Sequence, residues 1–472
     1  MNDDAVLRSV TELWDRSILP RIEDYIRIPC KSPAYDKDWE ANGHIEKAVR
    51  LVEAWCKEHA PAGATVEIVR LRGRTPVLLI DVPATPGADA SDTVLLYGHY
   101  DKQPEMSGWS EGLGPWLPVR RGDKLYGRGG ADDGYAAFAS LAALRAVREH
   151  GGAHRRAVVL IEGCEESGSF DLPFYLDHLG DKLGHPSLVV CLDSGSGNYE
   201  QLWLTTSLRG LVAGTLSVQV LDEGVHSGDA SGVVPSSFRI LRQLLDRVED
   251  ARTGKVLVEA FHVATPEDRR AQAEISGKVL GPSLFARFPW SGSTKPMGED
   301  VTDLVLARTW RPTLSVTGAA GLPPLENAGN VLRPHTSLKL SLRIPPGVNG
   351  KAASAELERI LLADPPYGAR VSFQADEPAD GWNAPTLSPW LERSLEASSQ
   401  AFYGKELCFM GEGGTIPFMA MLGRKFPEAQ FVITGVLGPQ SNAHGPNEFL
   451  HVPMAQKLTA CVARVLDDHA KR

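Results

Sequence analysis

Short apolar runs that alternate with a helical pattern constrain the fold of this 472-residue chain. Residues 94–97, 158–161 and 188–192 are rich in Val, Leu and Ile, as buried strands are, and residues 135–149 show the Ala- and Leu-rich pattern of a helix. Strands that alternate with helices favour a mainly parallel α/β sheet. In such a sheet, functional sites form at the carboxyl ends of the strands.

Side chains that bind metals follow each of these apolar runs. His99 ends the first, Glu165 and Glu166 follow the second, and Asp193 follows the third. Two imidazoles and several carboxylates suit a pair of borderline divalent ions such as zinc, and two metals that share a carboxylate can activate water and polarise a carbonyl. Metal-dependent hydrolysis is therefore the first hypothesis. The five candidate ligands are His99, Asp132, Glu166, Asp193 and His444.

Each local pattern also has an ordinary interpretation. His99 and Asp101 lie on the same side of an extended segment, so Asp101 can orient the imidazole, but a strand-end His followed by Asp is often incidental. Asp132 and Asp133 precede a helix, where Asp is a favoured N-cap; Asp133 alone would satisfy that role and leave Asp132 free to bridge metals.

The adjacent Glu165 and Glu166 are harder to explain without a metal. Two carboxylates buried side by side cost several kcal/mol unless a positive charge neutralises them. One can then be a ligand and the other a general base beside the activated water. Two solvated surface glutamates remain the alternative.

Composition narrows the class of protein. The net charge is -10 and the pI about 5.8, which argues against a nucleic acid or an anionic membrane as partner. No run approaches the roughly 20 apolar residues of a membrane span. The acidic start, Met1 to Asp4, lacks the features of a signal peptide, and the six cysteines form no C-x-x-C pair. We expect a cytoplasmic enzyme.

The pattern changes in the middle of the chain. After residues 209–210, an alternating run at 214–220 and a helical pattern at 236–249 are followed by a poorly patterned segment at 250–310. Strand-like runs at 313–317 and 337–344 precede a return to the first type of pattern, with a helix at 388–402 and a strand at 431–433. The chain is long enough for two or three domains. Because His444 lies in the last part, we expect the first and last parts to form one domain with an α+β insertion between them.

Four strings of residues together resemble peptidase family M20. They are Leu-Tyr-Gly-His-Tyr-Asp at 96–101, Leu-Tyr-Gly-Arg-Gly-Gly-Ala-Asp-Asp-Gly at 125–134, Glu-Gly-Cys-Glu-Glu-Ser-Gly-Ser at 162–169 and Gly-Glu-Gly-Gly-Thr-Ile-Pro at 411–417. The third and fourth are most similar to the carnosinase-type dipeptidase branch. The resemblance extends from about residue 20 to 455.

The resemblance implies a di-zinc aminopeptidase-like α/β catalytic domain with an inserted α+β lid that forms a homodimer. The catalytic domain would comprise residues 1–211 and 382–472, and the lid residues 212–381. His99 and Asp193 would bind one metal, Glu166 and His444 the other, and Asp132 both. Glu165 would be the general base, and a cis peptide would join Asp132 to Asp133. Asp101, as the residue that orients His99, is counted with Glu165 among the candidate catalytic residues.

The resemblance also assigns residues outside the metal centre. His226, in Val-His-Ser-Gly, would reach the partner subunit's active site and stabilise the oxyanion, and Asn330 would meet substrate near the same oxygen. Arg343, with Gly414 and Thr415, would bind the substrate carboxylate. For Arg343, a surface arginine on a strand is the ordinary interpretation.

The expected activity is hydrolysis of the amide bond of dipeptides or similar small peptides. It would use two divalent ions per chain, zinc or else manganese or cobalt. The alternative on the same fold is an N-acyl-amino-acid amidohydrolase: a deacetylase, desuccinylase or carbamoylase. A third hypothesis, a non-catalytic binding protein, conflicts with the presence of every expected ligand and of the base.

Overall fold

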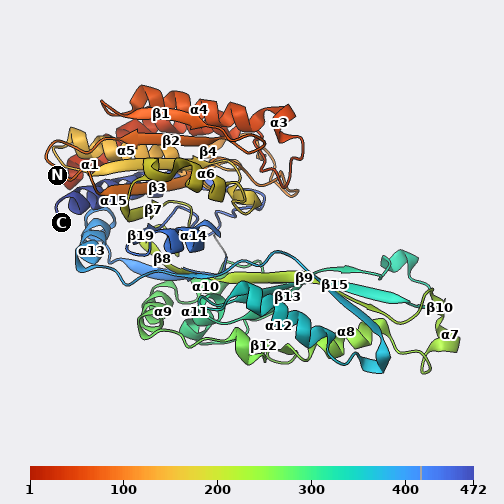
Figure 1. Cartoon of the computed structure of the whole chain (residues 1–472). Coiled ribbons are helices and arrows are strands. Elements are labelled where there is room, and N and C mark those ends of the chain that lie inside the picture. Colours follow the sequence, from red (N-terminus) through yellow and green to blue (C-terminus); the bar gives the residue numbers. More distant parts are fainter. Residues whose placement is uncertain (415–416) are drawn as a thin grey trace.

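A computed structural model describes residues 1–414 and 417–472. Its central feature is a six-stranded sheet in the order β1-β2-β6-β3-β7-β19 (Figure 1). The pairs β6–β3, β3–β7 and β7–β19 are parallel, and β1–β2 and β2–β6 are antiparallel. The sheet is therefore mixed. Its parallel strands are β6, β3, β7 and β19, and the predicted ligands His99, Glu165, Glu166 and Asp193 lie at or just after the ends of three of them. Its strands are β1 (Thr65–Val69), β2 (Val77–Val82), β3 (Thr93–His99), β6 (Arg156–Glu162), β7 (Pro186–Cys191) and β19 (Gln430–Ile433).

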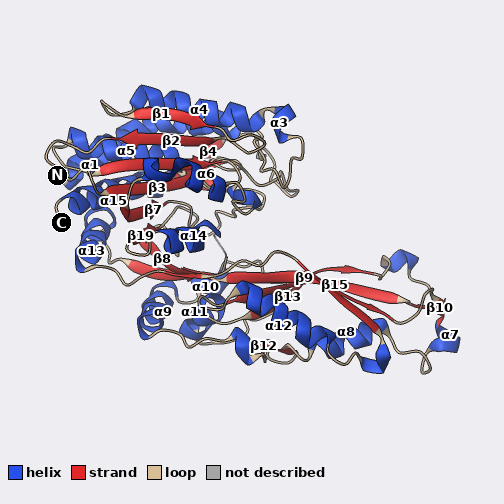
Figure 2. Cartoon of the chain, viewed as in Figure 1, coloured by secondary structure: helices blue, strands red, loops and turns tan. Residues whose placement is uncertain are grey.

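Helices cover both faces of this sheet, because its buried strands are apolar on both sides. Successive strand residues point to opposite faces. Leu96 and Val159 accordingly contribute to one core with α1, α4, α5 and α15, whereas Leu95 and Val158 contribute to a second core with α6 and α14. The layers are visible in Figure 2. These helices are α1 (Asp3–Leu13), α4 (His44–His59), α5 (Ala136–Glu149), α6 (Leu172–Leu179), α14 (Pro417–Lys425) and α15 (Val452–Ala470).

The N-terminal helical segment is interrupted. A π-helical turn (Trp14–Ile18) separates α1 from α2 (Leu19–Ile26). The buried Trp14 and Ile18 still face the core. The expected helix at 388–402 is present as α13 (Pro389–Tyr403).

A small sheet connects the two lobes of the molecule. β8 (Trp203–Leu208) pairs in parallel with β18 (Cys408–Glu412) and antiparallel with β17 (Trp382–Asn383). After Arg209 the chain enters β9 (Gly210–Gln219), which runs along the lower lobe (Figure 1). Because β8 lies between strands from the last part of the chain, both chain crossings between the lobes occur here.

The lower lobe is a four-stranded antiparallel sheet with helices on one face, in the order β13-β15-β9-β16. β9 and β15 alternate buried and partly exposed residues, as the sequence predicted for a half-buried sheet. Their buried side chains pack on α8 (Ser237–Leu245) and α12 (Gly350–Leu362). The other strands are β13 (Thr313–Ala320), β15 (His335–Ile344) and β16 (Arg370–Ala375).

The poorly patterned segment 250–310 includes three helices. It contains α9 (Glu267–Leu280), α10 (Ser283–Ala286) and α11 (Val301–Thr309). Ala273, Leu280, Leu284 and Leu306 pack with Met410 of β18, so these helices lie against the small connecting sheet. α9 presents mostly polar residues, which is why its period was weak. Among the described residues, no helix has the length and apolar character needed to cross a membrane.

Candidate metal centre

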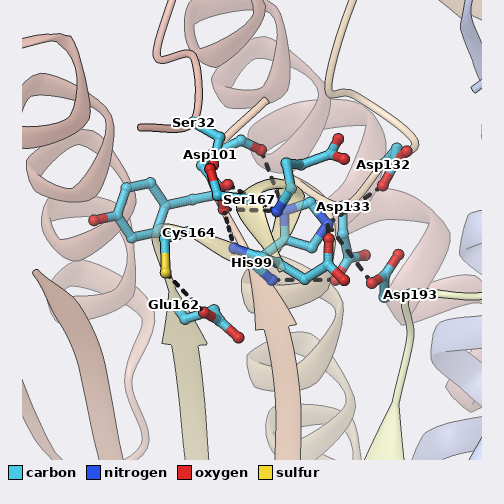
Figure 3. Close-up of polar contacts among 12 residues, drawn as sticks. Ser32, His99, Asp101, Asp132, Asp133, Glu162, Cys164, Ser167 and Asp193 are labelled. Atoms are coloured by element: carbon cyan, nitrogen blue, oxygen red, sulfur yellow. Dashed lines mark hydrogen bonds and ion pairs between the residues drawn. The ribbon is translucent and has the colours of Figure 1, made fainter. Parts of the chain in front are cut away.

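The candidate ligands converge at one edge of the main sheet. His99 is the last residue of β3, Glu165 and Glu166 begin a short 3-10 turn (Glu165–Ser167) after β6, and Asp193 follows β7 by two residues. Figure 3 shows His99, Asp132, Asp133 and Asp193 gathered beyond the strand ends. The prediction that parallel strands bring these side chains together is realised in the fold.

One group forms around His99. Its Nε2 lies 3.3 Å from Asp132 Oδ1 and 3.7 Å from Asp193 Oδ2. His99, Asp133 and Asp193 also offer ligand atoms that all lie within 4.8 Å of one another.

The second group forms around His444. Its Nε2 lies 3.1 Å from Asp132 Oδ2 and 3.3 Å from Glu166 Oε2. Asp132 thus presents one carboxylate oxygen to each histidine. This is the arrangement that a carboxylate shared by two ions requires.

The donor set fits divalent cations. Ligand atoms about 2.0–2.2 Å from a tetrahedral zinc stand roughly 3.4 Å apart, close to the spacings of both groups. Burial would lower the pKa of His99, but the carboxylates of Asp193, Asp101 and Asp132 raise that pKa well above its usual value. The carboxylates outnumber the imidazoles, so the buried cluster has an excess of negative charge that two divalent ions would neutralise.

Glu165 lies beside the first group. Its Oε2 is 4.0 Å from His99 Nε2, and only 12% of its side chain is exposed. Burial raises the pKa of Glu165 well above its usual value, and the negative charge of Asp193 raises that pKa further. A carboxyl that holds a proton more readily than an exposed glutamate has the property that a general base needs near neutral pH.

Asp101 supports both groups. Its two carboxylate oxygens accept hydrogen bonds from the backbone N–H groups of Glu165 (3.1 Å) and Glu166 (3.0 Å). Its Oδ1 also lies 3.4 Å from His99 Nδ1. The backbone carbonyl of Asp101 lies 3.2 Å from the same nitrogen, so Asp101 offers two acceptors there. Acceptors on the far ring nitrogen fix the tautomer that leaves Nε2 free for a metal. Glu166 has a further support, because Gln103 Nε2 donates to its Oε2 at 2.6 Å.

The N-cap interpretation of Asp133 is wrong. Tyr135 is the N-cap of α5, with no side-chain cap, and the Asp133 Oδ2 instead accepts from the backbone N–H of His99 at 3.3 Å. The peptide between Asp132 and Asp133 is cis, as the family resemblance implied. Gly98 leaves room for this contact, since a Cβ there would lie 2.6 Å from Asp133 Oδ2.

A buried ion pair that the sequence did not reveal holds the His444 loop in place. Arg128 Nη1 lies 2.5 Å from Glu448 Oε2, and Arg128 Nη2 donates to the backbone carbonyl of His444 at 3.0 Å. Glu448 Oε1 also accepts from the N–H of Gly129 at 2.8 Å. The loop that bears Asp132 is thereby fastened to the loop that bears His444.

Two other predicted residues lie far from this centre. His226 is in the short β10 (Val225–His226), which pairs with β14 (Val331–Leu332), next to Asn330. Figure 1 shows β10 at the end of the lower lobe remote from the main sheet. The His226 side chain is 68% exposed. The structure therefore groups His226 with Asn330 and separates both from the metal ligands of the same chain.

The residues predicted to bind a substrate carboxylate lie where the two lobes meet. Arg343 is near the end of β15, opposite Thr313 and Leu211 in the sheet. Gly414 is exposed and follows β18 by two residues. Thr415 lies outside the described residues.

The fold and the site define a class: an α/β protein with a candidate two-metal centre at the strand ends and an α+β insertion. The family model of peptidase family M20/M25/M40 matches residues 95–468, and the chain belongs to this family. The predicted resemblance and fold class are thus confirmed.

Relatives of named activity support the same branch of the family. The chain is 28% identical over 382 residues to the cysteinylglycine-S-conjugate dipeptidase of Corynebacterium striatum, covering 79% of this chain and 81% of the relative. It is 23% identical over 393 residues to human Beta-Ala-His dipeptidase, covering 79% and 73%. The structure of the dipeptidase Dug1p from Saccharomyces cerevisiae superposes with a TM-score of 0.80 at 20% identity, over 100% of this chain and 99% of that one.

Proposed function

We propose that this chain is a metallodipeptidase that hydrolyses the amide bond of dipeptides or similar small peptides with two divalent ions. The observation that supports this most directly is Asp132, whose two oxygens lie 3.3 Å and 3.1 Å from the Nε2 atoms of His99 and His444. The relatives named above are dipeptidases, which agrees with the chemistry of the donor set.

In this proposal His99 and Asp193 would hold one ion, Glu166 and His444 would hold the other, and Asp132 would contribute to both. Bound there, such ions would lower the pKa of a water molecule and polarise the scissile carbonyl.

Glu165 then takes a proton from the attacking water onto its carboxylate and delivers that proton to the leaving amine nitrogen. Asp101 keeps the Glu165 backbone and the His99 ring in position for this transfer. Because Asp101 makes these contacts through both oxygens, it acts as a positioning residue.

The substrate would lie between the lobes. Arg343 and the backbone of Gly414, with Thr415, would bind its carboxylate, for which a guanidinium is suited. His226, with Asn330 beside it, would stabilise the oxyanion from a partner subunit, since both lie at the remote end of their own lobe (Figure 1).

This assignment includes a homodimer formed through the lower lobe. Strand β13 is an edge of its sheet, and most of its residues are exposed. An edge strand offers unpaired backbone groups for pairing with another chain. The domain limits 1–211, 212–381 and 382–472 fit the crossings at β8–β9 and near β17, and a cytoplasmic location remains a prediction.

The N-acyl-amino-acid amidohydrolase alternative is not favoured, because the relatives described above are named for dipeptide hydrolysis. The deciding experiment compares turnover of a mixed dipeptide pool with turnover of N-acetyl, N-succinyl and N-carbamoyl amino acids by protein loaded with zinc, manganese or cobalt. Dipeptide cleavage with little or no release from the acyl compounds is expected. Cleavage of the acyl compounds alone would refute the proposal.

A further inference from the structure

A pocket of about 240 Å³ lies where α10 and α11 meet the small connecting sheet. Leu280, Leu284 and Met410 form its apolar wall. Arg287 and Arg308 supply its charge. We call this the arginine pocket. It is smaller than the roughly 300–1,000 Å³ of sites for drug-sized ligands, so it suits one substituent of a molecule.

The arginine pocket adjoins the candidate metal centre along the chain. Gly197 and Gln440 line it; Gly197 follows Asp193 by four residues, and Gln440 precedes His444 by four. The two segments are joined, because the N–H of Ser196 donates to the carbonyl of Leu437 at 3.1 Å. Four residues span at most about 14 Å, so Gly197 and Gln440 each lie within about that distance of a candidate ligand.

Arg308 has an incomplete set of partners. Among the described residues, its buried Nε has no hydrogen-bond partner, and its Nη2 donates to the Met410 sulfur at 2.8 Å. A thioether is a weak acceptor, and a buried donor without a partner costs about 1–3 kcal/mol. A ligand with strong acceptor oxygens would satisfy this guanidinium.

The surroundings of Arg308 are positive overall. Within the described part of the chain neither Arg287 nor Arg308 forms an ion pair with a carboxylate. Burial raises the pKa of the neighbouring Glu412, and the positive charges of Arg308 and Arg287 oppose that rise. Glu412 packs against Gly195, where a Cβ would lie 2.6 Å from its Oε1. Burial and the positive charges of Arg343 and Arg308 lower the pKa of Arg209 to about 10, which reports the same excess of positive charge.

We propose that the arginine pocket binds the carboxylate of an acidic substrate side chain and gives this enzyme a preference for dipeptides that contain glutamate. The inference rests on the proposed dipeptidase function and specifies its substrate class. The apolar wall would pack on the methylenes of the side chain, and Arg308 and Arg287 would bind its carboxylate through charge-assisted hydrogen bonds. Which of the two substrate residues enters the pocket is decided by the test.

The test measures affinity as well as turnover. Metal-loaded Glu165→Gln protein is titrated by calorimetry with Glu-Ala, Gln-Ala, Ala-Glu, Ala-Gln and Lys-Ala, and kcat/KM for the same peptides is measured with the metal-loaded wild type. Glutamine has the size of glutamate without its charge. We expect one glutamate peptide to bind about 10- to 100-fold more tightly than its glutamine counterpart, the range for a hydrogen bond to a charged group.

The variants Arg308→Gln and Arg287→Gln/Arg308→Gln should bring the ratio of glutamate-peptide to glutamine-peptide affinity toward one. A general loss of folding or activity would lower both affinities and leave their ratio unchanged. Arg311→Gln is the matched control, because Arg311 is nearby, exposed and paired with Asp303. That variant should keep the wild-type ratio.

Equal affinities for the glutamate and glutamine peptides would overturn the inference, and so would tighter binding of Lys-Ala, which would assign the pocket to Glu412. In either case, hydrolysis of neutral dipeptides would leave the proposed function intact. Failure of the wild type to hydrolyse any dipeptide would refute the proposed function, and the ratio of affinities would still test the pocket.

Discussion

The carboxylate of Asp101 accepts a hydrogen bond from the backbone N–H of Glu165 at 3.1 Å. The two residues come from different strand ends, β3 and β6, so this contact sets the position of the candidate base relative to His99. The same carboxylate lies 3.4 Å from His99 Nδ1. The backbone carbonyl of Asp101 is 3.2 Å from the same Nδ1, so one residue couples the orientation of a ligand to the position of the base.

Replacement of Asp101 should affect turnover more than folding. Asp101→Asn keeps the size of the side chain but offers only one acceptor oxygen for two backbone N–H groups and the imidazole. We expect metal affinity or kcat to fall about 10- to 100-fold, the usual effect of losing a residue that orients a metal ligand. Steady-state kinetics and elemental analysis measure the effect. Asp38→Asn, a change at an exposed turn aspartate, is the control. A fully active Asp101→Asn protein would contradict the assignment.

The two adjacent glutamates should respond differently to the same substitution. Glu165→Gln should retain metal yet lower kcat by about 10²–10⁴ or more, as expected for loss of a general base. Glu166→Gln should lose metal, because Glu166 Oε2 lies 3.3 Å from His444 Nε2 in the second group. Metal loss in Glu165→Gln with retention in Glu166→Gln would reverse the two roles. Near-normal turnover of Glu165→Gln would exclude it as the base.

Removal of metal should destabilise the protein as well as inactivate it. Without cations, the buried carboxylates around Asp132 repel one another, whereas ions that bind only the folded state stabilise it by about 2.7 kcal/mol for each site at a hundredfold excess over Kd. Elemental analysis of protein purified without chelator should give up to two equivalents, and chelation should lower Tm and abolish activity until metal is restored. Full activity with one equivalent or less would refute the dinuclear assignment.

The sequence predicted the metal ligands and the strands whose positions follow from a local pattern of apolar residues. His99 and Asp193 were predicted as neighbours because each follows an apolar run, and parallel strands end at one edge of a sheet. The alternating runs that became β9 and β15 were recognised for the same reason: one face of that sheet is buried and the other is not.

Other features depend on contacts that no local pattern records. Arg128 and Glu448 are separated by 320 residues, and neither belongs to a periodic segment that would suggest a buried ion pair. Asp133 had the pattern of an N-cap, but the backbone before α5 turns its side chain to the His99 N–H. α9 showed little periodicity, because only a narrow stripe of it packs on β18.

A buried histidine far from the metal centre should make stability depend on pH. His154 Nε2 accepts from Arg148 Nε at 2.8 Å while its Nδ1 faces the Arg155 carbonyl at 2.8 Å, so the neutral ring fits this site. Burial, and then the positive charge of Arg148, lower the pKa of His154 to about 4. Because this pKa is depressed in the folded state, the stabilisation is complete above the unfolded value of about 6.5 and is lost as pH falls toward 4, by up to about 3 kcal/mol.

Denaturant unfolding between pH 8 and pH 4 measures that loss. His154→Gln, whose amide can donate and accept but does not titrate, should flatten part of the decline relative to wild type. His185→Gln, at an exposed position, should follow the wild-type curve. Parallel curves for wild type and His154→Gln would show that His154 makes no such contribution.

Catalysis should require two chains, with His226 acting on the partner's site. His226 lies at the remote end of the lower lobe, 68% exposed and paired with the segment that bears Asn330 (Figure 1). A donor aimed at a developing oxyanion contributes about 3–4 kcal/mol, so His226→Ala should lower kcat by about 10²–10³ while metal content stays at the wild-type level. Mixing His226→Ala with the inactive Glu165→Gln chain should restore activity, because one site of the heterodimer then combines an intact base with an intact histidine.

Each parent homodimer lacks such a site and serves as its own control. Subunit exchange is verified with differently tagged chains and size-exclusion chromatography. No recovery after exchange, or an active monomer, would show that His226 does not act across the interface.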